Sequence, residues 1–292
     1  MSNNNNFVMV DSDVSSGNSG GNKFRNPLFN NTLQLEKIKK KLLTSSKYIS
    51  NVYSKYKTID SRPTTSALFI ASRLGEVEEL KKILKIDSSN VNKINNEGFS
   101  SLGIAALFEH KKVIKELLKN GADINIVDES GKTPLFEAVQ KKNLEIVIML
   151  LDKGANPNHI TIEKQTPLCL AIEEKNKQII STLLFYNADP NLSNYGFTPL
   201  CIAMNFAEEE STGTWDNEVI QMLLHNRALP NIPSITGDTP LCIASEGNIE
   251  GVDLLFKYVA NPNIPNIKGD TPLHIAVENN KFEQIKRIMW RN

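Results

Sequence analysis

The residues in this chain whose chemistry is easiest to name are Cys169, Cys201, Cys242 and His274. Three cysteine thiolates and one imidazole are a common ligand set for a structural zinc ion, which binds sulfur at about 2.3 Å. The chain holds 3 cysteines in all, so any disulfide within the chain would have to join two of these residues. Either chemistry requires the elements that carry the side chains to bring them together.

Each of these residues stands at the fourth position of one recurring hexapeptide, whose best copy is Thr-Pro-Leu-His-Ile-Ala at residues 271–276. The other copies precede it in the chain and begin at Ser66, Ser100, Thr133, Thr166, Thr198 and Thr239. Successive copies start 34, 33, 33, 32, 41 and 32 residues apart. A nearly fixed period of this length indicates an array of one supersecondary unit, in which each copy stacks on its neighbours.

A period near 33 residues combined with this hexapeptide resembles the ankyrin repeat. The resemblance covers roughly residues 64–292 and implies an all-α solenoid of stacked helix–turn–helix units with β-hairpin-like tips. A helix pair of this kind cannot bury its apolar face alone, so neighbouring repeats must share one continuous core. We expect repeats at about 64–97, 98–130, 131–163, 164–195, 196–236, 237–268 and 269–292.

This arrangement excludes a metal site at the row of cysteines and histidine. Packed helices lie about 8–10 Å apart, so side chains from consecutive repeats cannot all reach one zinc ion. The same spacing exceeds the roughly 7 Å between Cα atoms that a disulfide tolerates. We therefore expect the row to lie in the core, with no metal and no cofactor. The resemblance implies that His274 is the family's structural histidine, whose imidazole bridges the start of its helix to a neighbouring loop.

No group of residues in the sequence is arranged for catalysis. His110, His159 and His225 are scattered over different repeats without a consistent Cys or Ser companion. A Gly-rich phosphate loop, a pair of carboxylates for acid–base chemistry and a nucleophile elbow are all absent from the sequence. The segment before the repeats is too short and too polar for a catalytic domain. We therefore expect no catalytic residues and no enzymatic activity.

The composition is not that of a strongly basic or strongly acidic protein. The formal net charge is zero, so we expect no nucleic-acid partner. Residues 1–62 nevertheless carry ten Lys and Arg against four Asp and Glu, which makes a basic arm on an acidic remainder. The sequence has no signal peptide, no run of about 18 apolar residues and no closely spaced cysteines. We expect a cytoplasmic monomer without a transmembrane segment, and a nuclear location stays open.

The chain before the repeats divides into two parts. Residues 1–27 are rich in Asn, Ser and Gly and are expected to be disordered, because they cannot bury enough apolar surface to offset the entropy of ordering. Residues 28–63 are expected to hold a basic amphipathic helix, with Leu35 and Ile38 on its apolar face. Two interpretations stay open: this face packs on the first repeat, or residues 32–56 contact a membrane surface or a partner.

The interval of 41 residues marks about eight extra residues between the two helices of the fifth repeat, within residues 206–216. The insert contains Glu208, Glu209 and Glu210 beside Trp215. Insertions in repeat proteins map to loops on one face, which is often the binding face. Three carboxylates beside an aromatic anchor suit a basic peptide. Equally open is a tolerated surface insertion whose Trp215 packs back on the body.

By resemblance, ankyrin proteins bind their partners along the concave surface formed by the hairpin tips and the first helices. Exposed apolar side chains on a tip reduce solubility unless a partner covers them, which favours the tips from Ile162 to Ile235 for contact. Glu173 and Glu174, at the end of a first helix, would extend the acidic surface of the insert. Outside the insert we expect the protein partner to contact Glu129, Ile162, Glu163, Glu173, Glu174, Tyr195 and Ile235.

Two tips and both end repeats depart from the common pattern. Lys164 stands where a turn glycine is expected, and the tip at Asn194 is one residue short, so both hairpins are expected to have altered geometry. The first and last repeats are polar at two second-helix positions that are mostly apolar elsewhere. Terminal repeats need a solvated outer face, so these residues predict that the array begins and ends within this chain. The residues are Glu79, Lys82, Gln284 and Arg287.

These features favour a non-enzymatic protein–protein interaction scaffold, which binds its partner through the concave ankyrin groove and the acidic insert. The alternative is a regulatory adaptor, for example of the ubiquitin-ligase or signalling type. Such an adaptor would tether its partner to a membrane surface or a larger complex through the basic helix before the repeats. The fold is a general binding scaffold, so the resemblance alone does not choose between them.

Overall fold

The structure is a computed structural model, which describes residues 65–96, 98–206 and 214–291. These residues belong to a single compact unit. The expected disordered tail and the expected helix before the repeats lie outside the described residues. Glu208–Glu210 also lie outside them, as does the side chain of Trp215.

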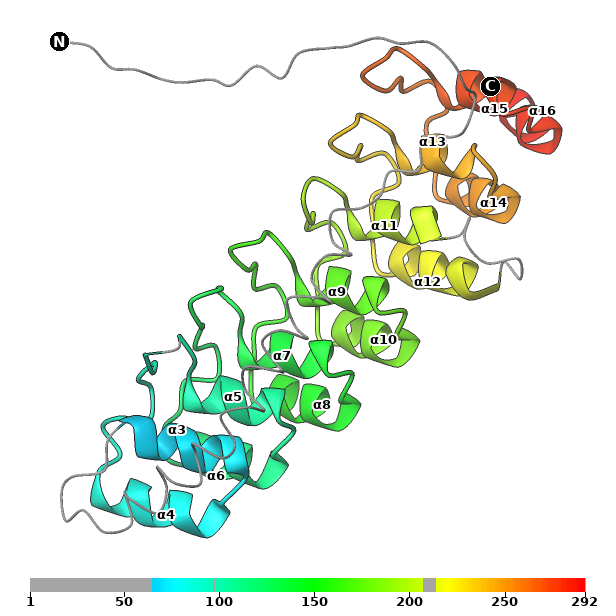
Figure 1. The fold of residues 1–292 in the computed structure, drawn as a ribbon. Helices are drawn as coiled ribbons and strands as arrows, with labels where there is room; N and C mark the ends of the chain where they lie inside the picture. Colours follow the sequence, from blue (N-terminus) through cyan, green and yellow to red (C-terminus); the bar gives the residue numbers. More distant parts are fainter. Residues whose placement is uncertain (1–64, 97, 207–213, 292) are drawn as a thin grey trace, which may run out of the picture. The chain divides into compact units, whose positions relative to one another are not determined.

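The described residues fold into pairs of helices that stack in two layers (Figure 1). The inner layer, next to the hairpin tips, contains α3 (Thr65–Leu74), α5 (Ser101–Leu107), α7 (Pro134–Gln140), α9 (Pro167–Glu173), α11 (Pro199–Phe206), α13 (Pro240–Ala244) and α15 (Pro272–Glu278). The outer layer contains α4 (Val77–Ile86), α6 (Lys111–Lys119), α8 (Leu144–Asp152), α10 (Lys177–Phe185), α12 (Thr214–His225), α14 (Ile249–Lys257) and α16 (Phe282–Met289). Each inner helix contacts the outer helix of its own repeat and the next inner helix. The predicted all-α solenoid of helix–turn–helix repeats is confirmed.

The hexapeptide forms the start of each inner helix. In α5 and the later inner helices its first residue precedes the helix as the N-cap, whereas α3 begins one residue before the hexapeptide. Proline follows at the first helical position from α7 onward, where its missing N–H costs nothing. In α7 the hydroxyl of Thr133 accepts a hydrogen bond from the amide of Phe136 at 3.2 Å, and the same bond recurs in α9, α11 and α13. After α6, α8, α10, α12 and α14 the chain turns through a residue with positive φ, which ends the helix. These residues are Gly121, Gly154, Asn187, Arg227 and Val259.

The three cysteines lie in the core, as predicted, and none forms a disulfide. Each thiol lies under the loop that closes its own repeat: the Sγ of Cys169 is 3.7 Å from the carbonyl oxygen of Leu192, and the Sγ of Cys201 is 3.8 Å from that of Ile232. Burial raises the pKa of the thiol to about 12 at Cys169 and to about 11 at Cys201, so both stay protonated. Within the described residues, no group of three or more His, Cys, Asp or Glu side chains could hold a metal ion.

His274, the last member of the row, is exposed, so the prediction that it lies in the core is wrong. Its Nδ1 accepts hydrogen bonds from the amide of Thr271 at 3.2 Å and from the hydroxyl of Thr271 at 2.9 Å. The imidazole thus binds the start of its own helix, which is one half of the bridge that the resemblance implies. Among the described residues, no hydrogen bond joins it to a neighbouring loop. Each cysteine is covered by the loop that follows the outer helix of its own repeat, whereas the described residues after α16 include no such loop to cover His274.

A row of asparagine side chains joins the loops of consecutive repeats. The amide group of Asn158 donates to the carbonyl oxygen of Asn187 at 3.0 Å and accepts from the backbone amide of Asp189 at 2.7 Å. Asn191 and Asn231 make the corresponding pair of contacts in the next two repeats. Each of these side chains satisfies two backbone groups of the following loop, so the row helps to fix the distance between repeats.

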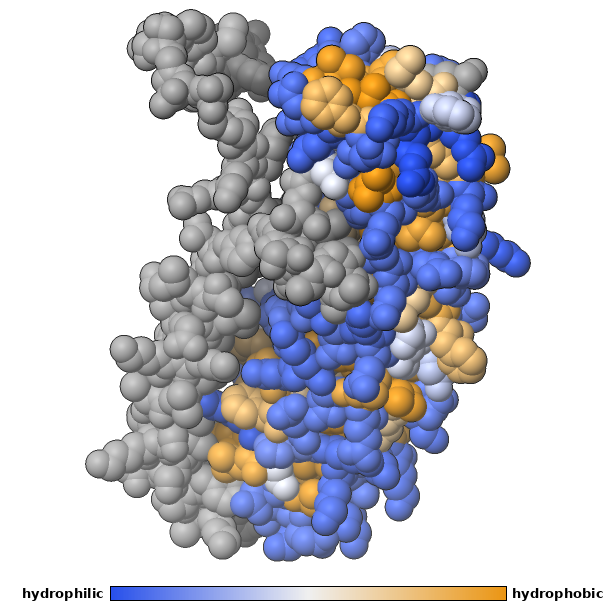
Figure 2. Space-filling model, turned by 90° about the vertical axis from the view of Figure 1, so that its right-hand side faces the viewer, coloured by the Kyte–Doolittle hydropathy of each residue, from blue (hydrophilic) through white to orange (hydrophobic). Residues whose placement is uncertain are grey.

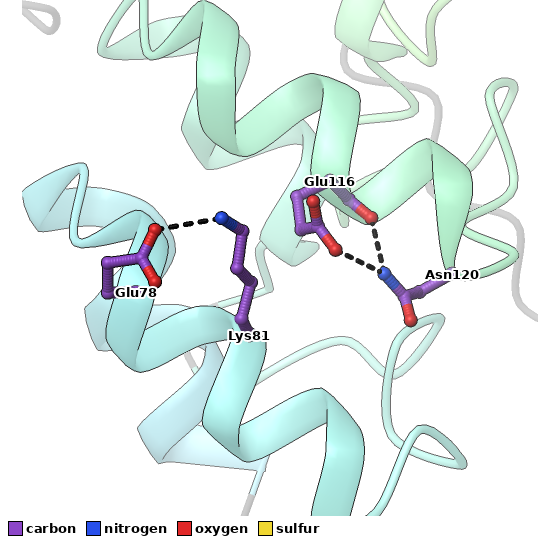
Figure 3. A network of polar contacts seen from close by, with 4 residues as sticks. All are labelled: Glu78, Lys81, Glu116 and Asn120. Carbon is purple, nitrogen blue, oxygen red and sulfur yellow. Dashed lines mark hydrogen bonds and ion pairs between the residues drawn. The ribbon is translucent and has the colours of Figure 1, made fainter.

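The outer helices present mostly polar side chains, with apolar ones scattered between them (Figure 2). On α4, Glu78 and Lys81 form an ion pair at 2.8 Å, and the Lys81 side chain lies between Glu78 and Glu116 of α6 (Figure 3). The hydrogen bond from Lys81 lowers the pKa of Glu78. The side-chain amide of Asn120 donates to the carbonyl oxygen of Glu116 at 2.7 Å and to its carboxylate at 3.1 Å. Exposed contacts of this kind keep the face solvated and add little to stability.

The polar residues of the end repeats do not all face solvent. Lys82 is exposed and pairs with the half-buried Glu79 at 3.2 Å. Arg287 is exposed and forms an ion pair with Asp253 of α14. Gln284, however, is buried, so the prediction of a solvated outer face is wrong at this position.

The insert of the fifth repeat is shorter than predicted. Phe206 is the last residue of α11, and α12 begins at Thr214, so both ends of the segment 206–216 are helical. With 12 residues, α12 is the longest of the described helices. Across the described ranges, no helix has the length and apolarity that spanning a bilayer requires.

Replacing Asn158 by alanine should lower the free energy of unfolding by about 1–2 kcal/mol, because two backbone groups of the next loop lose their partner. Urea unfolding followed by circular dichroism measures the change. Asn263 is the matched control, since it holds the same position in a later repeat and no contact joins its side chain to another described loop. A loss of similar size in Asn158→Ala and Asn263→Ala would contradict a role for the row in joining repeats.

Candidate protein-binding face

The concave face lies between the hairpin tips and the inner helices. Two hydrogen bonds span the corner between them: Lys132 Nζ to Gln140 Oε1 at 3.5 Å, and Gln165 Nε2 to Glu173 Oε2 at 3.3 Å. In these two repeats, the residue directly before the hexapeptide is therefore hydrogen-bonded to the residue eight positions further along the chain. In the fourth to seventh repeats these positions, here called the groove corner, are Gln165, Glu173, Phe197, Asn205, Asp238, Glu246, Asp270 and Glu278. Five of them are acidic and none is basic.

The hairpin tips form a second row along this face (Figure 1). A backbone hydrogen bond joins the second residue of a tip to the preceding tip at four junctions. The bonds run from Glu129 N to Gly98 O (3.0 Å), Ile162 N to Ser130 O (3.1 Å), Ile235 N to Gly196 O (2.8 Å) and Ile267 N to Thr236 O (3.4 Å). Turn glycines allow this close approach: a Cβ on Gly237, whose φ is +78°, would lie 2.6 Å from the amide nitrogen of Ile267.

Two tips depart from this pattern where the sequence marks them. Lys164 replaces the turn glycine and adopts the left-handed conformation, with φ of +62°, so the turn itself is kept. The short tip forms a two-residue turn, in which Asn194 and Phe197 exchange backbone hydrogen bonds at 2.7 and 2.8 Å. Both central residues have positive φ, +48° at Tyr195 and +82° at Gly196, as in a type I′ turn. The expected change of geometry is found at Asn194 and not in the turn at Lys164.

The structure brings several predicted contact residues to one part of this face. Ile162 and Ile235 are each 68% exposed, and Tyr195 is 41% exposed on the tip between them. Burial raises the pKa of the Tyr195 hydroxyl, and the nearby carboxylates of Glu163 and Glu173 raise it further. The tyrosine and these two glutamates therefore lie close together.

Other predicted contact residues have different surroundings. Glu129 is exposed on an earlier tip. Glu174 forms an ion pair with Lys142 of the preceding repeat at 2.8 Å, so its charge is already partly neutralised. The insert residues Glu208–Glu210 and the side chain of Trp215 lie outside the described residues.

Sequence reasoning missed Glu137, a buried carboxyl of α7. In the described part of the chain its Oε2 has no hydrogen-bond partner. Burial raises the pKa of this carboxyl from 4.5 to about 7; the charge of Lys132 opposes the rise and that of Asp128 adds to it. The sequence could have predicted this burial, because the fifth hexapeptide position is apolar in every other repeat. The corresponding residues are Ile70, Ile104, Leu170, Ile202, Ile243 and Ile275.

Sequence reasoning also missed the pairing of Glu173 with Asn194. The side-chain Nδ2 of Asn194 donates to Oε1 of Glu173 at 2.7 Å, and Asn194 is buried. Burial and the charge of Glu174 raise the pKa of Glu173 to about 7, while the Asn194 hydrogen bond lowers it. These side chains lie on a first helix and on the tip that follows it, and no residue pattern in the sequence predicts their contact.

A separate apolar surface covers the last repeat, at the upper end of the view in Figure 2. Its members belong to α15, to α16 or to the residue after α16. They are Val277 (55% exposed), Phe282 (70%), Met289 (61%) and Trp290 (88%). None of these residues was a predicted contact.

Comparison with known proteins assigns the chain to a family. A family model for ankyrin repeats matches residues 40–128, 68–161 and 212–290, and a single ankyrin repeat matches residues 163–195. The chain therefore belongs to the ankyrin-repeat family. A search of curated protein sequences found no match.

Solved structures agree with this assignment. The ankyrin repeat domain of Bcl-3, a member of the IkappaB protein family, is 23% identical with a TM-score of 0.64, over 76% of this chain and 97% of that one. The human ASB11 ankyrin repeat domain is 28% identical with a TM-score of 0.57, over 77% of this chain and 97% of that one. Ankyrin repeats are protein–protein interaction modules and are typically non-enzymatic, so fold and family together define a partner-binding protein.

Replacing Glu137 by glutamine should increase stability at pH 8 and change it little at pH 5. The folded-state pKa of about 7 exceeds the unfolded value of 4.5, so the unfolded state releases its proton first as pH rises. The wild-type carboxyl therefore costs stability progressively between these two pH values, reaching about 3 kcal/mol above pH 7. Urea unfolding across this pH range measures the difference between variant and wild type.

The control is Glu76→Gln, directly before α4, which is exposed and should give a difference that varies little with pH. A difference for Glu137→Gln that is equally independent of pH would show that this carboxyl titrates normally in the folded protein.

Proposed function

We propose that this chain is a non-enzymatic interaction scaffold that binds a basic segment of a partner protein in its concave groove. The acidic groove corner of the fourth to seventh repeats is the observation that carries the proposal. A basic segment lying along it would meet opposite charge at three of four consecutive repeats. Complementary charge of this kind raises the association rate and excludes acidic partners.

The acidic insert belongs to the same proposal. Glu208, Glu209 and Glu210 follow α11, which ends at Phe206, in the middle of these four repeats. Together with Trp215 they would add negative charge and an aromatic anchor to the surface that receives the partner. The exposed isoleucines of the tips supply apolar contact area beside the charges.

The proposed scaffold needs no catalytic residue, metal ion, cofactor or nucleic acid. We propose in addition that residues 1–27 form a disordered tail and residues 28–63 a basic helical segment before the repeat domain of residues 64–292. Within this proposal the protein is a cytoplasmic monomer.

A second candidate is a regulatory adaptor that tethers its partner to a membrane surface or a larger complex. The excess of ten Lys and Arg over four Asp and Glu in residues 1–62 favours it, because a basic amphipathic segment binds anionic surfaces. In that case the main recruiting surface is the segment before the repeats, and changes in the insert leave recruitment intact.

Reversing the three insert charges with Glu208→Lys, Glu209→Lys and Glu210→Lys should reduce capture of basic partners from a cell lysate at least fivefold. The melting temperature should stay the same, since the substitutions lie in the insert between α11 and α12. Quantitative mass spectrometry of the captured proteins measures the loss.

The matched control reverses three glutamates on outer helices: Glu145→Lys, Glu218→Lys and Glu250→Lys on α8, α12 and α14. It has the same net charge as the insert variant and should retain the wild-type set of partners. An unchanged set of partners in the insert variant would defeat the insert proposal and favour the adaptor.

A further inference from the structure

One junction in the row of hairpin tips is open. Backbone hydrogen bonds join the first three tips to one another and the last three to one another. Among the described residues, none joins the tip at Ile162–Lys164 to the tip at Asn194–Phe197. The cause is local: Lys164 carries a Cβ where the other tips have a turn glycine, and the turn at Asn194 is one residue shorter.

A buried acceptor without a donor lies at this open junction. In the other tips, the first residue uses a side-chain oxygen to accept an amide of its own turn. These pairs are Asn95 with Phe99 (2.9 Å), Asp128 with Ser130 (2.9 Å), Thr161 with Gln165 (3.1 Å), Ser234 with Thr236 (3.3 Å) and Asn266 with Lys268 (3.0 Å). Asn194 begins a two-residue turn, and its Oδ1 is buried with no partner in the described part of the chain. An unpaired buried acceptor is costly, so a donor that reaches it gains correspondingly.

Tyr195 lies at this junction in a backbone conformation that is unfavourable for tyrosine. A φ of +48° at the first central residue of a type I′ turn is normally left to Asn, Asp or Gly. Strained residues of this kind persist where something other than local stability favours them. The aromatic ring is 41% exposed, and its hydroxyl lies near the carboxylates of Glu163 and Glu173.

We propose that the open junction is a socket for an arginine side chain in an extended segment of the partner protein. The guanidinium would donate to the carboxylates of Glu163 and Glu173 and, once the short turn shifts to admit it, to the buried Oδ1 of Asn194, while its planar face stacks on the ring of Tyr195. The backbone amide of Tyr195, which donates to no neighbouring tip, can pair with a carbonyl oxygen of the segment. The socket rests on the proposed function and adds the recognised side chain and its location.

The chemistry of the walls selects this occupant over others. An apolar side chain would leave Asn194 Oδ1 without a donor and would cover two carboxylates without neutralising them. An acidic side chain would be repelled by the same carboxylates. Lysine offers a point charge, whereas arginine offers five donors in a plane that several acceptors can share. The exposed Ile162 beside the junction favours an apolar residue next to the arginine.

Binding of a defined peptide to the full-length protein tests the socket. The probe is a fluorescein-labelled Gly-Ala-Leu-Arg-Leu-Arg-Leu-Ala-Gly peptide, followed by fluorescence anisotropy, and its neutral isostere carries citrulline in place of both arginines. We expect citrulline to weaken binding at least tenfold. Tyr195→Asn and Glu173→Gln should each weaken arginine-peptide binding at least tenfold, whereas Ile267→Asn, on the last tip, should change it less than twofold.

Tyr195→Asn should keep or raise the melting temperature, because asparagine tolerates the left-handed conformation; lost binding then cannot be attributed to unfolding. Equal binding of both peptides, absence of saturable binding, or full affinity in Tyr195→Asn and Glu173→Gln would each overturn the socket. Arginine-peptide binding that both variants retain would overturn the socket alone, because a basic segment would then lie elsewhere in the groove. The insert variant tests the proposed function independently.

Discussion

The burial of each inner helix against the next repeat is the interaction on which the rest of this structure depends. Leu135 and Ala138 of α7 are fully buried, and the helix pair to which they belong is too small to bury them alone. The packing therefore fixes how far apart consecutive repeats lie, and the asparagine row joins their loops at that distance. Because the hairpin tips and the groove corner are attached to these helices, they repeat at the same distance. A partner therefore contacts a regularly spaced set of side chains.

The helical core provides stability and the hairpin tips provide contact surface, which explains where the sequence varies and how much stability each variation removes. The core depends little on the tips, so a lysine in place of a glycine or a turn shortened by one residue disturbs one junction without disturbing the helices behind it. Glu137 is the opposite case, because it places a carboxyl in a buried row and costs stability at neutral pH. The open junction between Lys164 and Asn194 lies within the stretch where the groove corner becomes acidic, which makes it the most distinctive part of the face.

The sequence predicts the fold almost completely, because the period, the N-cap threonine and the left-handed residues after the outer helices are all local signals. It also predicts the buried cysteines, since their register follows from the hexapeptide, and it marks Lys164 and Asn194 as irregular. It does not predict the exposure of His274, which depends on the loop that covers each cysteine, or the burial of Gln284. The contact of Asn194 with Glu173 could not be predicted either, because it joins a first helix to the tip that follows it through the geometry of one shortened turn. The glutamates of the insert remain predictions from the sequence.

The central claim is that the row of hairpin tips is interrupted at one junction and that a partner completes it there. Amide hydrogen exchange measured by NMR, in the free protein and with the arginine peptide, tests this most directly. The account predicts slow exchange at Glu129, Ile162, Ile235 and Ile267, fast exchange at Tyr195, and slowing at Tyr195 when the peptide is added. Protection of the Tyr195 amide in the free protein, equal to that of the other four, would contradict it.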